Sequence, residues 1–300
     1  MSLPPSTAPE SSIRCWASKT AMKIAILQMT AGFDPAANAA VLTDAVAQAR
    51  AGGAKMLFTP EMSNMLDRNR ARAAENIRYE VEDPVLAAVR AAAADEGMWV
   101  HLGSLAVRGA DATDGGGGKW RNRAFVIAPD GGVAARYDKI HLFDVDLASG
   151  ESWRESSVYQ GGNQAVAVRL PDAVLGLSIC YDIRFPAVYS ALSRAGADIV
   201  AVPAAFTVPT GEAHWHVLLR ARAIESACFV VAAAQTGTHP DGRSTYGHSL
   251  VVDPWGDVLL DMGEEPGLAF ADLPIERIAE VRGRVPVIAN RRPVGEAVVA

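Results

Sequence analysis

Cysteine is scarce in this sequence: Cys15, Cys180 and Cys228 are the only three, and no two of them form a CxxC motif. Such scattered thiols exclude a disulfide scaffold and are typical of a reducing compartment. We therefore expect a cytoplasmic protein with free thiols. The chain also lacks an apolar run long enough to span a bilayer, so we expect no membrane partner.

Strongly basic segments are missing as well. The formal net charge is −6 and the isoelectric point is about 5.6, which argues against a nucleic-acid partner because nucleic acids attract basic surfaces. Apolar residues are abundant, since 50% of the 300 residues are hydrophobic. That composition is ample for a large globular core.

The motifs that would indicate phosphate, serine or metal chemistry are incomplete. The glycine run at 115–118 lacks the Ser or Thr of a phosphate loop, because Trp120 stands in that place. The segment that begins at Gly247 lacks the second glycine of a serine nucleophile elbow. His214 and His216 do not face one ligand when they lie on a helix, so we expect no metal site.

The first 21 residues differ from the rest of the chain. Ser, Pro and Thr dominate them, and they contain no apolar core of the signal-peptide type. We expect residues 1–21 to form a disordered extension. No convincing linker follows, so the sequence predicts a single domain over residues 22–300.

From residue 23 onward, strand-like and helix-like segments alternate. Strands are predicted at 23–29, 55–58, 98–107, 121–128, 132–137, 165–170, 174–179, 198–202, 229–234, 247–252, 258–261 and 268–272. Helices are predicted at 36–51, 84–97, 186–195, 212–228 and 275–281, and a loop around 144–164. Helices connect some of the predicted strands. Tight turns, such as the one at 129–132, connect others. This pattern indicates mixed sheets covered by helices, an α/β layered sandwich.

The most informative segment surrounds Cys180. The apolar residues 174–179 predict a buried strand that stops at this cysteine, and Pro186 suits the first turn of a helix. A thiol on such a turn is held rigidly beside backbone N–H groups that can stabilise negative charge. A cysteine that only fills the core fits these residues equally well, so other groups must decide between the two interpretations.

Two further reactive side chains follow predicted strands. Glu61 comes shortly after the strand at 55–58, and Lys139 follows the strand that ends near Tyr137. Because sites in open α/β sheets form beyond the carboxyl ends of strands, we expect both side chains at one rim with Cys180. Together they suit amide hydrolysis, with a thiol nucleophile, a carboxylate base and an ammonium that stabilises the oxyanion.

Three segments resemble motifs of the nitrilase, or carbon–nitrogen hydrolase, superfamily: FTPE at 58–61, YDKIHLFDVD at 137–146 and CYDIRFP at 180–186. The resemblance implies a four-layer α-β-β-α sandwich that pairs into dimers or larger homo-oligomers. It assigns the catalytic triad to Glu61, Lys139 and Cys180, with no cofactor and no metal. It also implies that Glu155 is a second active-site glutamate that positions the substrate and the other triad groups, while a solvated loop carboxylate is the alternative for this residue.

The segments 219–225, 231–235 and 246–256 resemble the Nit branch, and within it the deaminated-glutathione amidases more than the ω-amidases. The resemblance implies hydrolysis of a small amide through a cysteine thioester, with ammonia as the leaving group. Deaminated glutathione is the expected substrate, and an ω-amide such as α-ketoglutaramate is the alternative. Ala187 and Val294 replace acidic residues that are frequent in the family, which leaves the choice of substrate open.

Five further residues are predicted to bind substrate: Tyr181, Arg184, Phe206, Thr207 and His214. Tyr181 would supply a backbone N–H to the oxyanion, and Arg184 would pair with a substrate carboxylate. A salt bridge from Arg184 to an acid such as Asp182, and packing roles for Phe206 and His214, remain open. A non-catalytic scaffold of the same fold and an acyltransferase are the other functions that the sequence allows.

Overall fold

The computed structural model describes residues 21–109, 118–146, 150 and 152–299. Almost all of the predicted N-terminal extension, and most of the glycine run at 115–118, therefore lie outside the described residues. In the described part of the chain, no helix has the length and apolarity that crossing a membrane requires.

The first of two large sheets has the strand order β16-β1-β2-β3-β4-β5. Strands β1, β2 and β3 are parallel, while β4, β5 and β16 join antiparallel to their neighbours. The bounds are β1 Met22–Gln28, β2 Met56–Phe58, β3 Trp99–Arg108, β4 Trp120–Ile127, β5 Val133–Asp138 and β16 Gly267–Leu273.

The second sheet has the order β15-β14-β11-β10-β9-β8, with β9, β10 and β11 parallel and the rest antiparallel. Its strands are β8 Val166–Arg169, β9 Val174–Leu177, β10 Ile199–Ala201, β11 Phe229–Ala232, β14 Leu250–Val252 and β15 Val258–Asp261. Both sheets are thus mixed, as predicted.

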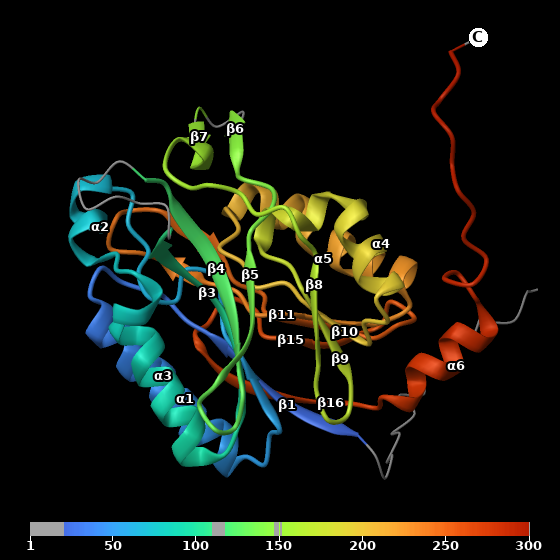
Figure 1. Cartoon of the computed structure of the whole chain (residues 1–300), viewed down its shortest axis with the longest axis horizontal. Helices are drawn as coiled ribbons and strands as arrows, with labels where there is room; N and C mark the ends of the chain where they lie inside the picture. The colour runs from blue at the N-terminus through green and yellow to red at the C-terminus, as the bar shows by residue number, and fades with distance from the viewer. Residues whose placement is uncertain (1–20, 110–117, 147–149, 151, 300) are drawn as a thin grey trace, which may run out of the picture.

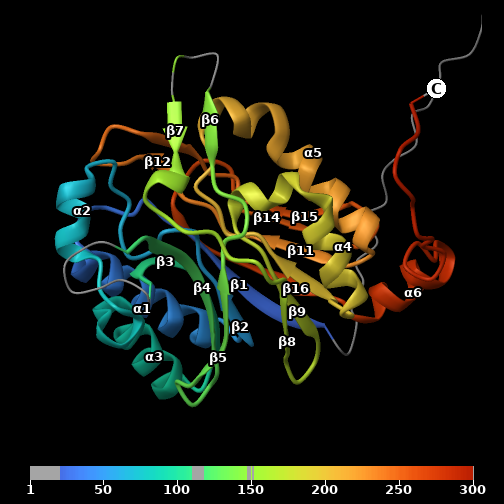
Figure 2. The same ribbon diagram turned by 45° about the horizontal axis from the view of Figure 1, so that its top comes forward.

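Helices cover the outer face of each sheet (Figures 1 and 2). Helices α1 (Pro35–Ala51) and α3 (Pro84–Glu96) lie against the first sheet, and α4 (Pro186–Arg194) and α5 (Val208–Ser226) lie against the second. Helix α6 (Glu276–Arg284) follows the last strand, and the residues after it run away from the body of the molecule. The four-layer α-β-β-α sandwich is therefore confirmed.

The layering follows from strands that are apolar on both faces. Along β1, Ile24 and Ile26 belong to the core between the two sheets. The alternate residues Ala25 and Leu27 belong to the core beneath α1 and α3. Successive side chains of a strand point to opposite faces, so one continuous apolar run serves both cores.

The structure adds short elements that the sequence pattern does not reveal. They are helix α2 (Arg70–Asn76), the 3-10 turns Glu80–Glu82, Glu155–Ser157 and Cys180–Arg184, and the strand pairs β6 (Asp144–Asp146) with β7 (Ser152–Arg154) and β12 (Thr236–Thr238) with β13 (Ser244–Tyr246). Strands of three residues are too short to show a hydrophobic period. The predicted loop at 144–164 is therefore partly a hairpin, and helix α5 begins at Val208 rather than at residue 212.

Candidate active site

Cys180 lies on a sharp turn between strand β9 and helix α4. The strand ends at Leu177, and Cys180 then opens a 3-10 turn with a φ of 48°, a left-handed conformation that is unusual for a residue with a side chain. Its backbone N–H donates to the Pro203 carbonyl oxygen at 2.9 Å. This strained turn holds the thiol beyond the carboxyl end of β9. Strained backbone of this kind is often found at functional sites.

The carboxylate of Asp182 holds this turn in place through hydrogen bonds. It is fully buried and accepts hydrogen bonds from the Tyr137 hydroxyl at 2.6 Å and from the Ile179 N–H at 3.0 Å. Its other oxygen lies 2.9 Å from the donating His141 N–H and 2.7 Å from Nδ1 of the same residue. Asp182 therefore joins the nucleophile turn to the end of β5, and it does not pair with Arg184.

Glu61 is delivered to the same place by a tight turn after β2. Oε2 of its carboxylate accepts from the Ala205 N–H at 2.9 Å, and the Gln235 side chain donates to its carbonyl oxygen at 3.0 Å. Gly103 on β3 lies against this turn, and a Cβ there would overlap the carbonyl oxygen of Thr59. The close approach of two backbones thus requires a glycine and sets the position of Glu61.

Lys139 directly follows β5 and points at two carboxylates. Its Nζ lies 2.9 Å from Oε1 of Glu61 and 2.9 Å from Oε2 of Glu155. All three side chains are largely buried, with 3% of the lysine side chain exposed. Buried charges of this kind need close partners of opposite sign, so the three groups hold one another in place.

Asn122 completes this network. Its side-chain amide donates to Glu61 at 2.8 Å and to Glu155 at 3.2 Å, and its backbone carbonyl oxygen accepts from the backbone N–H of Lys139 at 2.9 Å. Glu155 also accepts from the Phe143 N–H at 2.6 Å. Asn122 was not predicted from the sequence, because a single polar residue in a predicted strand carries no spacing signal.

The charges of the network shift the pKa values of Cys180 and Lys139. Burial raises the pKa of the Cys180 thiol well above its ordinary value, and the charge of Glu61 raises it further against the opposing effect of Lys139. Burial alone would lower the pKa of Lys139, but the charges of Glu155 and Glu61 outweigh it and raise the pKa well above its ordinary value. The thiol is thus protonated and the lysine charged at neutral pH.

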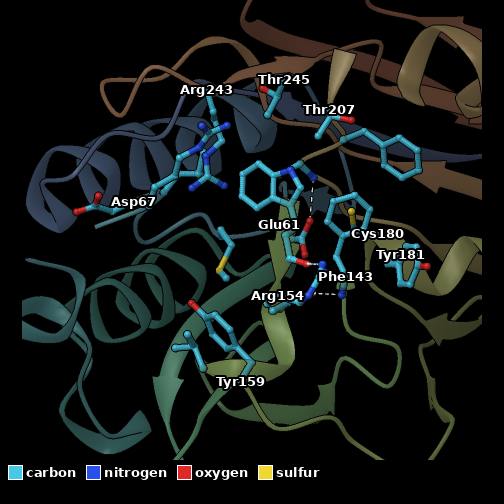
Figure 3. A pocket seen from close by; sticks show the side chains of 18 of the residues that line it. Glu61, Asp67, Phe143, Arg154, Tyr159, Cys180, Tyr181, Thr207, Arg243 and Thr245 are labelled. Carbon is cyan, nitrogen blue, oxygen red and sulfur yellow. Dashed lines mark hydrogen bonds between the residues drawn. The ribbon is translucent and has the colours of Figure 1, made fainter. Parts of the chain in front are cut away.

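These groups lie at the wall of a cavity of about 770 Å³ (Figure 3). Of the residues predicted for the site, the lining includes Glu61, Lys139, Glu155, Cys180, Tyr181, Phe206 and Thr207. Figure 3 shows Glu61 and Cys180 near each other, with Phe143 and Tyr181 beside them.

Arg184 and His214 take a different position. They do not belong to the lining of this cavity, and a nitrogen of Arg184 lies 3.2 Å from Nδ1 of His214. The Arg184 guanidinium also lies 5.4 Å from the centre of the Phe206 ring, a cation–π contact. Their role in substrate binding therefore stays a prediction.

Other residues of the cavity were missed by sequence reasoning. Arg68, Trp153 and Arg243 line it from a loop, from β7 and from the turn before β13. No motif marks them, since they come from short elements that only the tertiary structure brings together.

Comparison with known proteins identifies the family of the chain. Residues 23–283 match the family model described as carbon-nitrogen hydrolase. The chain belongs to the carbon–nitrogen hydrolase family. A relative from Synechocystis named deaminated glutathione amidase is 50% identical over 179 residues, which cover 59% of this chain and 66% of the relative. A mouse relative of the same name is 38% identical over 90% of this chain and 83% of its own length.

Solved structures of this carbon–nitrogen hydrolase family also resemble the chain. The NitFhit protein of C. elegans has a TM-score of 0.82 at 35% identity, over 91% of this chain and 65% of that protein. An amidase from Nesterenkonia sp. AN1 has a TM-score of 0.75 at 28% identity, over 90% of this chain and 94% of its own. In that structure, a glutamate-to-glutamine variant carries the acetamide moiety of fluoroacetamide on its active-site cysteine.

Proposed function

We propose that this carbon–nitrogen hydrolase is an amidase that cleaves small non-peptide amides through a thioester on Cys180. The observation that carries the proposal is the buried contact of Lys139 with Glu61, at the wall of the cavity that also holds Cys180. A neutral thiol needs a base at hand to attack an amide carbon. The carboxylate of Glu61 is that base, and the covalent adduct on the cysteine of the Nesterenkonia amidase supports the route.

The reaction has two steps, formation of the thioester on Cys180 and its hydrolysis. The Cys180 sulfur forms a bond with the amide carbon while the thiol proton passes to Glu61, and the C–N bond breaks as Glu61 returns that proton to the departing nitrogen. Water then attacks the thioester and gives a proton to Glu61, and the C–S bond breaks. The proton returns to the sulfur, so the sum is amide plus water to carboxylic acid plus amine.

Two donors are available for the oxyanion of each tetrahedral intermediate. Lys139 is held as a cation by two carboxylates and lines the cavity with Cys180. Tyr181 is the second residue of the 3-10 turn that Cys180 opens, and the first N–H groups of a helix have no partner within it. Preorganised donors of this kind stabilise developing charge without reorganisation. Glu155 keeps Lys139 oriented, a positioning role.

Deaminated glutathione is the substrate that we propose first, because the Synechocystis and mouse relatives carry that name. This compound has no primary amide, so the leaving group is the amine of a dipeptide rather than the ammonia expected from the sequence. An ω-amide such as α-ketoglutaramate, the second candidate, would release ammonia. The two candidates therefore differ in their products.

The test is turnover of both compounds, with the released dipeptide measured by mass spectrometry and the ammonia by a coupled assay. We expect the wild type to act on deaminated glutathione and Cys180→Ala to lose essentially all turnover. Cys228→Ala is the matched control, because Cys228 is buried in the core away from the cavity lining. Full turnover by Cys180→Ala would refute the mechanism, and absence of any turnover by the wild type would favour the non-catalytic scaffold.

An acyltransferase would use the same thioester but transfer the acyl group to an amine. Including hydroxylamine with the substrate distinguishes the two outcomes, since a transferase forms the hydroxamate in preference to the acid. We expect the acid to dominate, because Glu61 is placed to activate water for attack on the thioester.

We further propose that the protein acts in the cytoplasm as a homodimer or larger homo-oligomer. Several apolar side chains on α5 and β15 are exposed, among them Val217 at 69% and Leu259 at 44%. Exposed apolar side chains of this kind favour association when they are covered by a second copy of the chain. Light scattering coupled to size exclusion tests the assembly, and a monomer at micromolar concentration would refute it. The two described cysteines are both free, which supports a reducing compartment, and cell fractionation tests the location.

A further inference from the structure

Two arginines converge on one tryptophan at the wall of the cavity. The guanidinium carbon of Arg68 lies 4.6 Å from the centre of the Trp153 ring, and that of Arg243 lies 5.1 Å from it. The three residues come from segments far apart in the sequence, and all three line the cavity. Figure 3 places Arg243 on the opposite side of the view from Cys180 and Tyr181.

The buried carboxylate of Asp241 orients this arrangement. It accepts from the backbone N–H of Arg68 at 2.9 Å and from Nε of Arg243 at 2.9 Å, and a further nitrogen of Arg243 lies 2.8 Å away. Its side chain is 3% exposed, whereas that of Arg243 is 17% exposed. A guanidinium carries five N–H donors, so this pairing leaves donors of Arg243 available towards the cavity.

Arginines are frequent in this part of the lining, and two of them pair with acids that do not belong to it, Arg243 with Asp241 and Arg154 with Asp146. Four arginines line the cavity, Arg68, Arg70, Arg154 and Arg243, whereas Asp67 is the only aspartate in the described lining. The two lining glutamates, Glu61 and Glu155, are engaged with Lys139. The guanidinium groups of Arg68 and Arg243 both lie within 5.1 Å of the centre of the Trp153 ring, and guanidinium N–H groups are good donors to a carboxylate.

The volume of the cavity indicates how large a ligand it can hold. A cavity of about 770 Å³ falls in the range of roughly 300–1,000 Å³ that holds drug-sized ligands. A short ω-amide that reacts at Cys180 would leave much of it empty. An extended substrate would fill it, and its far end would lie near Trp153.

We propose that Arg68 and Arg243, supported by Trp153, bind a carboxylate at the end of an extended amide substrate remote from the carbonyl that Cys180 attacks. The inference rests on the proposed amidase function and defines its substrate class: peptide-like amides with a distal carboxylate. Planar guanidinium groups suit a carboxylate because they donate in pairs. Deaminated glutathione ends in the carboxylate of its glycine and belongs to this class, whereas α-ketoglutaramate has no such extension.

The test compares deaminated glutathione with its glycine methyl ester, which has the same length but no distal charge. We expect the wild type to favour the carboxylate by about 10- to 100-fold in kcat/KM, the usual effect of a charge-assisted pair. Arg243→Gln and Arg68→Gln should lose most of that preference, and Arg243→Lys should keep part of it because it keeps the charge without the fork. Arg169→Gln, at the exposed end of strand β8, is the matched control and should keep the full preference.

Two results would overturn the proposal: equal turnover of carboxylate and ester by the wild type, or an undiminished preference in both glutamine variants. A uniform loss on both compounds would indicate a structural role for the arginines and would equally refute it. Calorimetric binding of the two compounds to Cys180→Ala measures the same preference without turnover. The carboxylate site is therefore testable even if the proposed amidase function fails, and the two failures can be told apart.

Discussion

The ammonium of Lys139 lies 2.9 Å from Oε1 of Glu61, although 78 residues separate them in the sequence. The same ammonium contacts Glu155, so two carboxylates share one cation. Burial, and after it the negative charge of Glu61, raises the pKa of the Cys180 thiol, so the thiol keeps its proton. Catalysis then depends on proton transfer to Glu61 during attack rather than on a preformed thiolate.

We expect Glu61→Gln to reduce kcat by about 10²- to 10⁴-fold, the usual contribution of a general base. An amide cannot accept the thiol proton, but it preserves the size of the side chain, so the fold should persist. Steady-state turnover and circular dichroism check this, with the exposed Glu75→Gln as control. Turnover within a few-fold of wild type would assign the base to another group.

The pH profile of kcat/KM should show no thiol titration. An ordinary cysteine with a pKa of about 8.5 gains more than tenfold in thiolate between pH 7 and 9. Burial raises the pKa of Cys180 well above its ordinary value, so the neutral thiol is the form that reacts, and since its population does not change over this interval we expect no such rise in kcat/KM. Cys228, whose pKa burial raises to about 12, should resist alkylation in the folded protein. A tenfold increase in kcat/KM centred near pH 8.5 would contradict the proton-transfer mechanism.

Replacing Asn122 by Asp should lower kcat by about 100-fold or more. The amide of Asn122 donates to Glu61 and Glu155, whereas a carboxylate would place a third negative charge against both and disturb their protonation. Kinetics of Asn122→Asp and of the exposed Asn163→Asp make a matched pair. Equal activity of the two variants would show that the network tolerates the charge.

Buried His101 should make the protein less stable in acid. Burial lowers its pKa to about 3, and neither ring nitrogen has a hydrogen-bond partner among the described residues. Below pH 6.5 the unfolded chain binds a proton that the folded chain does not, so the free energy of unfolding falls with pH. From this residue alone the loss is about 2 kcal/mol between pH 7 and 5.

Urea unfolding of wild type and His101→Phe at both pH values measures this effect. The variant cannot bind the proton, so its drop in unfolding free energy should be about 2 kcal/mol smaller than that of wild type. The exposed His214→Gln should show the wild-type drop. If His101→Phe shows the same drop as wild type, the histidine is not the source of the acid sensitivity.

Much of the fold follows from local patterns. The apolar runs around β1 and β9, the Pro–Asp–Gly–Gly turn before β5 and Pro186 at the start of α4 predict their elements to within a few residues. These features depend on hydrophobic period and backbone restriction, which short segments carry by themselves. The positions of Glu61, Lys139 and Cys180 after strands, together with their motifs, likewise predict that they meet.

The sequence by itself determined the family, the layered architecture and the three reactive groups, because each depends on a motif or a period within one segment. Only the tertiary structure decided that Asn122 joins Glu61 to Glu155 and that Arg184 lies beside His214 outside the cavity lining. It alone also brought Arg68 and Arg243 to Trp153. These contacts join residues that are distant in the chain and lie in short elements, so their closeness exists only once both sheets have packed.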